Sequence, residues 1–374
     1  MTLEKKISGL LEENIRTNVF PCINVGISYE KNKKKKQHII TAEKKIDQTN
    51  KELVNENLFF DLASLTKPFA TALSLLSLIN EGKISINTQL KNIFNDNIPA
   101  DKRNISVEQL LSHSAGFPDH RPYYKQLVEV NPARRPKLLL ELLMAEPLLA
   151  EPGSAVLYSD LGYMLLGLVI EKVSRLKLDI YFSTMIMAPI GLGEHIFFKP
   201  IGSGKNPPGR FAPVEYCPWR GRILRGEVSD DNCWALGGVA GHAGLYGDVK
   251  GVLKLSELIL DIWQGHGRHP HIKRRDLVAF LSRTSGLQGD TWALGFDRPN
   301  PAGGASCGKY LSTASVGHLG FTGTSFWLDP ERKLVIVILS NRVHPSRANK
   351  RIKKFRPAFH DRVVEWLEVE LRET

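Results

Sequence analysis

The sequence contains few cysteines, and they are scattered. Four of the 374 residues are cysteine, at Cys22, Cys217, Cys233 and Cys307. Their spacing matches neither a zinc-binding pattern nor the framework of a disulfide-rich domain. We therefore expect four reduced thiols in a reducing compartment. A chain of this length can bury a large core without crosslinks.

Long apolar runs are also missing. No stretch reaches the roughly 20 apolar residues that a membrane-spanning helix needs. The first twenty residues have the pattern of an amphipathic helix, unlike a leader with a charged and then an apolar part. We expect a cytoplasmic protein with no membrane span.

Acidic residues are outnumbered by basic ones. The 50 Lys plus Arg residues exceed the 39 Asp plus Glu residues, which gives a formal net charge of +11. Much of this excess lies in two runs, residues 31–36 and 347–356, and such runs are usually solvated turns or tails. The basic balance could help to hold anionic substrates. No nucleic-acid-binding motif accompanies it, so we predict no nucleic-acid partner.

The order of strand-like and helix-like segments predicts an α+β fold. An expected hairpin, residues 22–29 and 38–42, lies near the N-terminus, and the pattern from about 101 to 290 is mainly helical. Four further strand-like segments lie near the C-terminus: Trp292–Phe296, Val316–His318, Ser325–Leu328 and Leu334–Leu339.

We therefore predict an antiparallel sheet built from both chain ends, flanked by helices, with an inserted all-helical subdomain. The prediction is a single catalytic domain over residues 1–374. Its α/β lobe takes about 1–63 and 285–374, and its helical lobe about 64–284. Active sites favour the cleft between two such lobes.

Ser64 and Lys67 form the first chemical signal, at the start of an aliphatic helix that we expect to stop near Gly82. Residues three apart share one helix face, so the amine and the hydroxyl lie close together. A base that takes the serine proton makes the hydroxyl a nucleophile, and the helix dipole disfavours the ammonium form. Ser174 and Lys177 have the same spacing at the charged end of another expected helix, so the spacing alone is not specific.

Tyr158 and Asp160 open a second apolar helix, residues 159–173. A tyrosine hydroxyl near a lysine ammonium is easier to ionise, which makes Tyr158 a candidate general base or acid. The simpler interpretation is that Ser159 or Asp160 only caps the helix.

A glycine-rich segment, residues 317–325, joins two of the expected strands. Glycine lets a ligand approach the backbone closely. N–H groups of an edge strand beside Ser64 can supply half of an oxyanion hole. His242-Ala243-Gly244 has a similar pattern, but no strand follows it, and we interpret it as a structural loop.

In this order, the three groups resemble the penicillin-binding-protein-like serine hydrolases. This family includes class C β-lactamases, D-alanyl-D-alanine carboxypeptidases and related esterases and D-aminopeptidases. The phrases that carry the resemblance extend from about Phe59 to Asn341: FDLASLTK, QLLSHSAGFPD, PGSAVLYSDLGYMLLG, LGGVAGHAGLYG and GHLGFTGTSFWLDP.

The resemblance implies roles for particular residues. Ser64 is expected to be acylated, with Lys67 and Tyr158 as its catalytic partners. The backbone N–H groups of Ser64 and Phe321 are expected to form the oxyanion hole, and Gly320 belongs to the same substrate-binding segment. The implied chemistry uses no metal and no cofactor.

Two positions depart from the class C pattern. Asp160 replaces an asparagine, and a carboxylate near Lys67 favours the ammonium form and shifts the base role toward Tyr158. His318 replaces the lysine of many β-lactamases, and a mostly neutral imidazole is a poorer anchor for a carboxylate.

We therefore predict a serine hydrolase of small-molecule esters, amides or peptides, with cell-wall-derived or D-amino-acid compounds among the candidates. The first alternative is a class C-like β-lactamase or D-Ala-D-Ala carboxypeptidase. The second is a non-catalytic binding protein with the same fold.

Two further motifs indicate other kinds of site, an α/β-hydrolase nucleophile and a zinc site. Residues 304–308 match G-x-S-x-G, but the motif needs a preceding strand and a following helix, and this one lies in a loop-like segment. His266, His269 and His271 could bind zinc, although loops rich in Gly, Arg and Pro carry such histidines without a metal.

Overall fold

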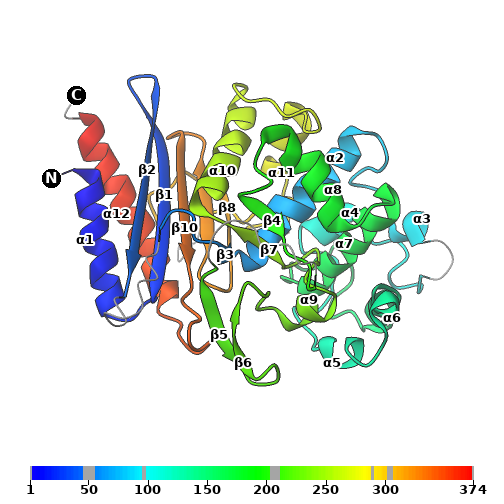
Figure 1. Cartoon of the computed structure of the whole chain (residues 1–374). Helices are drawn as coiled ribbons and strands as arrows, with labels where there is room; N and C mark the ends of the chain where they lie inside the picture. Colours follow the sequence, from blue (N-terminus) through cyan, green and yellow to red (C-terminus); the bar gives the residue numbers. More distant parts are fainter. Residues whose placement is uncertain are drawn as a thin grey trace.

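The computed structural model describes residues 2–44, 55–94, 98–202, 211–287, 290–300 and 306–372. Its largest sheet has five antiparallel strands in the order β2-β1-β10-β9-β8 (Figure 1). The strands are β1 (Cys22–Lys31), β2 (Lys34–Glu43), β8 (Val316–Leu319), β9 (Ser325–Asp329) and β10 (Leu334–Ser340). Because β1 pairs with β10, the sheet joins the two ends of the chain, as predicted.

Helices cover both faces of this sheet (Figure 1). α1 (Leu3–Arg16) and α12 (Ile352–Arg372) lie on one face, and α10 (Val249–Gln264) lies on the other. Side chains alternate between the two faces of a strand. In β10, Ile336 and Ile338 belong to the core under α1 and α12, and Val335 and Val337 belong to the core under α10. Burial on both sides explains the continuous apolar run of this strand.

The middle of the chain holds most of the helices. α7 (Asp160–Ser174) packs against α4 (Val107–Leu111), which begins with a capping box between Ser106 and Gln109. The others are α2 (Leu73–Asn80), α3 (Leu90–Phe94), α5 (Tyr124–Leu127), α6 (Arg135–Ala145), α8 (Leu178–Tyr181), α9 (Asp231–Ala235) and α11 (Arg274–Ser282). Among the described residues, no helix is long and apolar enough to cross a membrane. The four cysteines are buried free thiols.

The prediction of an all-helical insertion was wrong in two places. A small sheet has the order β3-β7-β4, made of β3 (Phe60–Asp61), β7 (Leu245–Gly247) and β4 (Ile196–Phe198). β5 (Pro213–Cys217) and β6 (Arg222–Arg225) form a hairpin. Strands of two to five residues are too short to leave a clear alternating pattern in the sequence.

The predicted strand at residues 292–296 is also absent. Trp292 makes only an isolated bridge to Asp297. Gly295 has φ +91°, a conformation that interrupts an extended strand.

Candidate active site

Ser64 lies in an irregular helix start directly after β3. Residues 63–65 form a 3-10 turn, residues 67–72 form a π-helical turn, and the regular helix α2 begins only at Leu73. Ala63 has φ +49°, which is uncommon for a residue other than glycine, and its N–H donates to Asp61 Oδ1 at 2.8 Å. The sequence predicted a regular helix here. Left-handed residues and π-helical turns cluster at functional sites.

The amine of Lys67 is fully buried beside Ser64. Its Nζ lies 3.0 Å from Ser64 Oγ, 2.6 Å from Asp160 Oδ1 and 3.3 Å from the His242 carbonyl oxygen. An ammonium has three N–H donors, so the three acceptors match the charged form. Burial lowers the pKa of Lys67, but Asp160 and Tyr158 outweigh burial and raise the pKa overall. Lys67 is therefore a cation at rest, as predicted from Asp160 and opposite to the helix-dipole expectation.

Tyr158 borders both of these groups. Lys67 Nζ lies 4.9 Å from its ring centroid, and Lys67 and Ser64 both act to lower the pKa of its hydroxyl. Burial raises the pKa of the Tyr158 phenol. Lys67 opposes this effect and Asp160 reinforces it, so the pKa is raised overall. The prediction that Tyr158 ionises more easily than usual was therefore wrong for the resting site, because burial and Asp160 outweigh Lys67.

The start of α7 places the Asp160 carboxylate beside Lys67. Ser159 caps the helix, since its Oγ accepts the Gly162 N–H at 3.1 Å. Asp160 follows in the first turn and pairs with Lys67. Ser159 is therefore the helix cap, as the simpler interpretation expected, whereas Asp160 also forms an ion pair with Lys67. At the other end of α7, the side chain of Lys177 is 65% exposed and pairs with Glu171.

His113 and Trp292 pack against Tyr158, and the sequence did not single out either residue. Their ring centroids lie 4.5 and 5.3 Å from that of Tyr158. His113 Nδ1 accepts the Ser159 N–H at 3.1 Å. Burial, with the nearby Lys67 charge, holds the pKa of His113 well below its usual range. A neutral imidazole and an indole therefore restrict the orientation of the phenol.

His318 lies behind the site and outside the cleft lining. Its ring centroid is 5.4 Å from that of Trp292 and 6.3 Å from that of Tyr158, and its Nδ1 bonds the Leu319 carbonyl oxygen at 2.9 Å. Burial and the Lys67 charge lower the pKa of His318 to about 3. The predicted substrate contact by His318 therefore has no support in the geometry, whereas its predicted neutrality agrees with this pKa.

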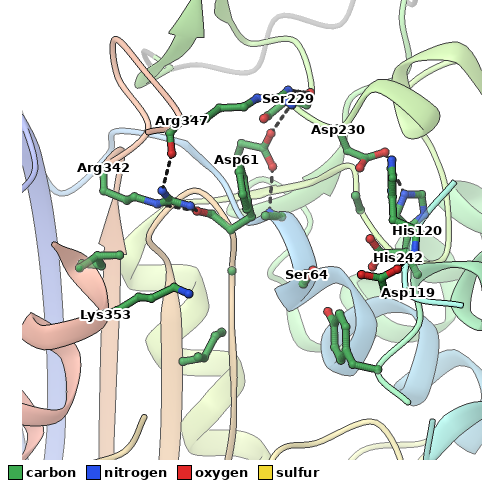
Figure 2. A pocket seen from close by; sticks show the side chains of 18 of the residues that line it. Asp61, Ser64, Asp119, His120, Ser229, Asp230, His242, Arg342, Arg347 and Lys353 are labelled. Atoms are coloured by element: carbon green, nitrogen blue, oxygen red, sulfur yellow. Dashed lines mark hydrogen bonds and ion pairs between the residues drawn. The ribbon is translucent and has the colours of Figure 1, made fainter. Parts of the chain in front are cut away.

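Ser64 opens into a cleft of about 700 Å³. On one side lie acidic and imidazole groups, and on the other side lie arginines and Lys353 (Figure 2). The acidic and imidazole side includes Asp119, His120, Asp230 and His242, and the basic side includes Arg342, Arg347, Lys350, Lys353 and Arg356. The interpretation of residues 347–356 as a solvated run was therefore incomplete, because four of its cations line the cleft.

The glycine-rich loop around His242 belongs to the site as well. The His242 carbonyl oxygen accepts from Lys67, and its Nε2 is 2.9 Å from Asp230 Oδ1. Burial would raise the pKa of Asp230, but His242 holds it well below its usual range. Our interpretation of this loop as purely structural was wrong.

The turn between β8 and β9, residues 320–324, is fastened to the segment that precedes Ser64. Thr322 Oγ1 donates to the Asp61 carbonyl oxygen at 2.7 Å, and Thr324 Oγ1 donates to that of Leu62 at 3.0 Å. Phe321 is half exposed and lines the cleft with Ser64. Among the described residues, the Phe321 N–H has no acceptor.

Gly320 is required by the close approach of these two segments. A Cβ at this position would overlap Thr324 Oγ1 and lie 2.7 Å from the Leu62 carbonyl oxygen. We expect Gly320→Ala to lower the free energy of unfolding by about 1–3 kcal/mol, as overpacking does. Gly9→Ala on α1 is the control: nothing lies within 4 Å of its Cβ position, so it should stabilise by about 0.5–1 kcal/mol. Urea unfolding measures both values, and equal effects would contradict the packing argument.

In the described residues, neither the histidine cluster nor the G-x-S-x-G segment forms a functional site. His269 uses both ring nitrogens in backbone hydrogen bonds, with Ile186 and His271. Among the described residues, no group of three or more His, Cys, Asp or Glu side chains could hold a metal ion. In the G-x-S-x-G segment, residues 304 and 305 lie outside the described parts, and Ser306 lies in a turn.

A serine, a lysine and a tyrosine lie in contact beside the edge of an antiparallel sheet, the arrangement expected of a serine hydrolase of the penicillin-binding-protein type. Residues 37–356 match the Beta-lactamase family model. The chain belongs to this family of serine hydrolases.

Individual relatives agree with this assignment. The chain is 33% identical over 319 residues to a Salmonella agona (strain SL483) protein named "Putative D-alanyl-D-alanine carboxypeptidase". The match covers 80% of this chain and 73% of that protein. In fold the chain is similar to EstCE1, described as a hydrolase with promiscuous acyltransferase activity. The TM-score is 0.69, the identity is 20%, and the match covers 94% of this chain and 97% of that one. It is also similar to a penicillin-binding protein from Bacillus halodurans, with TM-score 0.67, 18% identity, and coverage of 93% and 99%.

Proposed function

We propose that the protein hydrolyses an ester or an amide through an acyl-enzyme on Ser64. The observation that carries the proposal is the position of the Lys67 amine, 3.0 Å from Ser64 Oγ and 2.6 Å from Asp160 Oδ1, in contact with Tyr158. A non-catalytic binding protein would have no use for a buried amine held against a serine hydroxyl.

In the first step, which starts from the form of the Lys67–Tyr158 pair that has lost one proton, Ser64 Oγ attacks the carbonyl carbon and its proton passes to that pair. The N–H groups of Ser64 and Phe321 stabilise the negative charge on the carbonyl oxygen. The bond to the leaving group breaks as that group takes a proton from the pair, which leaves the acyl group on Ser64. Water then attacks the acyl-enzyme and the same pair takes and returns its proton.

Lys67 and Tyr158 titrate as one unit, because they lie in contact and the charge state of each changes the pKa of the other. At rest the Lys67 ammonium pairs with the Asp160 carboxylate and the Tyr158 phenol is neutral, so the group has no net charge. Losing one proton creates the base, and the raised pKa values of Lys67 and Tyr158 place that loss on the alkaline side.

Asp160→Asn tests this electrostatic account. The carboxylate raises the pKa of both Lys67 and Tyr158, so its removal lowers both, and the base forms at lower pH. We expect the rising limb of the kcat/KM–pH profile to move to lower pH, by about one unit or more for a charge within 4 Å. A limb that stays in place, or moves to higher pH, would show that Asp160 does not control the base.

We favour an ester or amide substrate that carries no charge near the scissile bond over a β-lactam. The position that carries lysine in many β-lactamases is His318, whose pKa of about 3 leaves it neutral. A D-Ala-D-Ala carboxypeptidase is the second candidate. It is favoured by the name of the Salmonella relative, and by Lys350 and Lys353 along the cleft, where they could hold a carboxylate.

Three substrates separate these activities in one assay format: p-nitrophenyl acetate, nitrocefin and an N-acylated D-alanyl-D-alanine peptide. We expect Ser64-dependent hydrolysis of the ester with the highest kcat/KM. Faster nitrocefin turnover would reverse the order in favour of a β-lactamase. Faster release of D-alanine would establish the carboxypeptidase, and Lys353→Ala should then raise KM for the peptide more than for the ester.

A further inference from the structure

Two buried arginines hold the turn that carries Phe321. Arg342, just after β10, donates from Nε and Nη2 to the Phe321 carbonyl oxygen at 2.8 and 2.5 Å. Arg356, on α12, donates from Nη2 to the carbonyl oxygens of Gly320 and Thr324 at 2.8 and 2.6 Å. Both arginines come from the C-terminal part of the chain and reach the turn from the basic side of the cleft, where Figure 2 shows Arg342.

The hydrogen-bond partners of Arg342 and Arg356 are unusual for buried arginines. The two residues are 7% and 5% exposed, and buried guanidinium groups normally pair with carboxylates. Among the described residues, neither Arg342 nor Arg356 forms an ion pair, and their hydrogen bonds go to main-chain oxygens. Burial, together with the Arg342 charge, lowers the pKa of Arg356 to about 9. Keeping this cation buried therefore costs folding free energy, which needs a compensating reason.

The peptide group between Gly320 and Phe321 supplies that reason. In a trans peptide unit the C=O and the N–H lie in one plane and point in opposite directions. Arg356 binds the Gly320 carbonyl oxygen, and the other end of the same unit is the Phe321 N–H. Fixing the oxygen therefore fixes the direction of this N–H. Arg342 holds the next peptide unit by the Phe321 oxygen, so the planes on both sides of Phe321 Cα are held.

A cation bonded to the carbonyl also changes the strength of the donor. Hydrogen bonds in a chain polarise one another, so a guanidinium at the oxygen makes the N–H at the opposite end a better donor. The Phe321 N–H has no acceptor among the described residues and borders the same cleft as Ser64. It is therefore available to a developing oxyanion.

We propose that Arg356, supported by Arg342, is a positioning residue that orients and polarises the Phe321 N–H for the oxyanion formed at Ser64. The proposal rests on the acyl-enzyme function proposed above. It assigns to the cleft's buried arginines a task other than binding an anionic substrate.

The test compares two probe substrates, p-nitrophenyl acetate and its thionoacetate, in which sulfur replaces the carbonyl oxygen. Sulfur is a weaker hydrogen-bond acceptor, so the thionoester gains little from an oxyanion hole. In Arg356→Lys the charge is kept, but the shorter side chain withdraws the donor from the Gly320 and Thr324 carbonyl oxygens. We expect kcat for the oxygen ester to fall about 10-fold, less than the 10²–10³ for a deleted donor, with KM within about twofold. The thionoester should change much less, so the ratio of the two rates falls.

Arg351→Lys is the matched control, since Arg351 lies in the same basic run and donates to the Thr17 carbonyl oxygen at 2.8 Å, away from the turn. It should leave both rates unchanged. Arg342→Lys, with the same readouts and a circular dichroism melt, decides the case if Arg356→Lys does not fold.

The possible outcomes distinguish a failure of the positioning role from a failure of the proposed hydrolase function. An unchanged ester-to-thionoester ratio in a folded variant, or equal losses on both probes, would overturn the positioning role and leave the hydrolase intact. Loss of fold in both lysine variants would assign the arginines to stability and overturn it too. Wild-type turnover that does not depend on Ser64 would instead refute the proposed function.

Discussion

Ser64→Ala is expected to reduce kcat/KM for p-nitrophenyl acetate by at least about 10³-fold, because removing the nucleophile of a serine hydrolase removes the covalent route. The same substitution should abolish labelling by a fluorophosphonate probe. The methyl side chain fits the space of the hydroxymethyl group, so the thermal midpoint should stay within a few degrees. Initial rates, gel fluorescence and a thermal melt measure the three quantities.

The chain offers its own control for this experiment. Ser174 has a lysine three residues later, as Ser64 does, but it ends α7 and lies on the surface, where Lys177 pairs with Glu171. Ser174→Ala should leave labelling and turnover unchanged. If Ser64→Ala kept its labelling, or if Ser174→Ala lost it, the nucleophile would have been misassigned.

Lys67→Met is expected to lower kcat by about 10²–10⁴-fold, the usual contribution of a positioned acid–base group. Methionine fills a similar volume but cannot accept or return the Ser64 proton. It also leaves the Asp160 carboxylate, whose side chain is 21% exposed, without its partner. Removing one member of a fully buried ion pair destabilises the fold by about 3–5 kcal/mol. We expect a smaller loss of stability here, because Asp160 is partly exposed.

A double variant separates the two effects. Lys67→Met with Asp160→Asn removes the uncompensated charge, so the thermal midpoint should recover while kcat stays low. Lys177→Met provides the surface control and should stay within about twofold of the parent rate. Recovery of activity together with stability in the double variant would mean that Lys67 acts only as a structural cation.

What could be predicted from the sequence was local in origin. A serine and a lysine three apart and a hairpin of two adjacent strands each depend on neighbours along the chain. Their structures follow the predictions, apart from the irregular turn at residues 63–72. The order of strand-like and helix-like segments predicted the sheet, and the resemblance of the ordered motifs predicted the family.

The parts that were missed depend on contacts across the fold. His242 lies 175 residues from Lys67 along the chain and binds it through a backbone oxygen, which any residue type could supply. Arg342 and Arg356 also bind backbone oxygens, so nothing in the sequence of the turn identifies them as partners. His318 was placed by analogy with a lysine. Its burial behind Tyr158 depends on packing that the motif does not encode.

These contacts describe a site in which charge is balanced before substrate arrives. Lys67, Asp160 and Tyr158 form a neutral group around Ser64, and the N–H of Phe321 faces no competing acceptor among the described residues. Such preorganisation lowers the reorganisation needed when the oxyanion forms. We therefore expect specificity to depend on the walls of the cleft, one acidic and one basic, more than on the reacting groups.

The most direct test is to trap the acyl-enzyme and locate it. The protein is mixed with p-nitrophenyl acetate, quenched in acid within the first turnover, and analysed by intact mass and peptide mapping. We expect one added acetyl group, carried by the peptide that contains Ser64 and absent from Ser64→Ala. Turnover without any adduct, or an adduct on another residue that persists in Ser64→Ala, would contradict it.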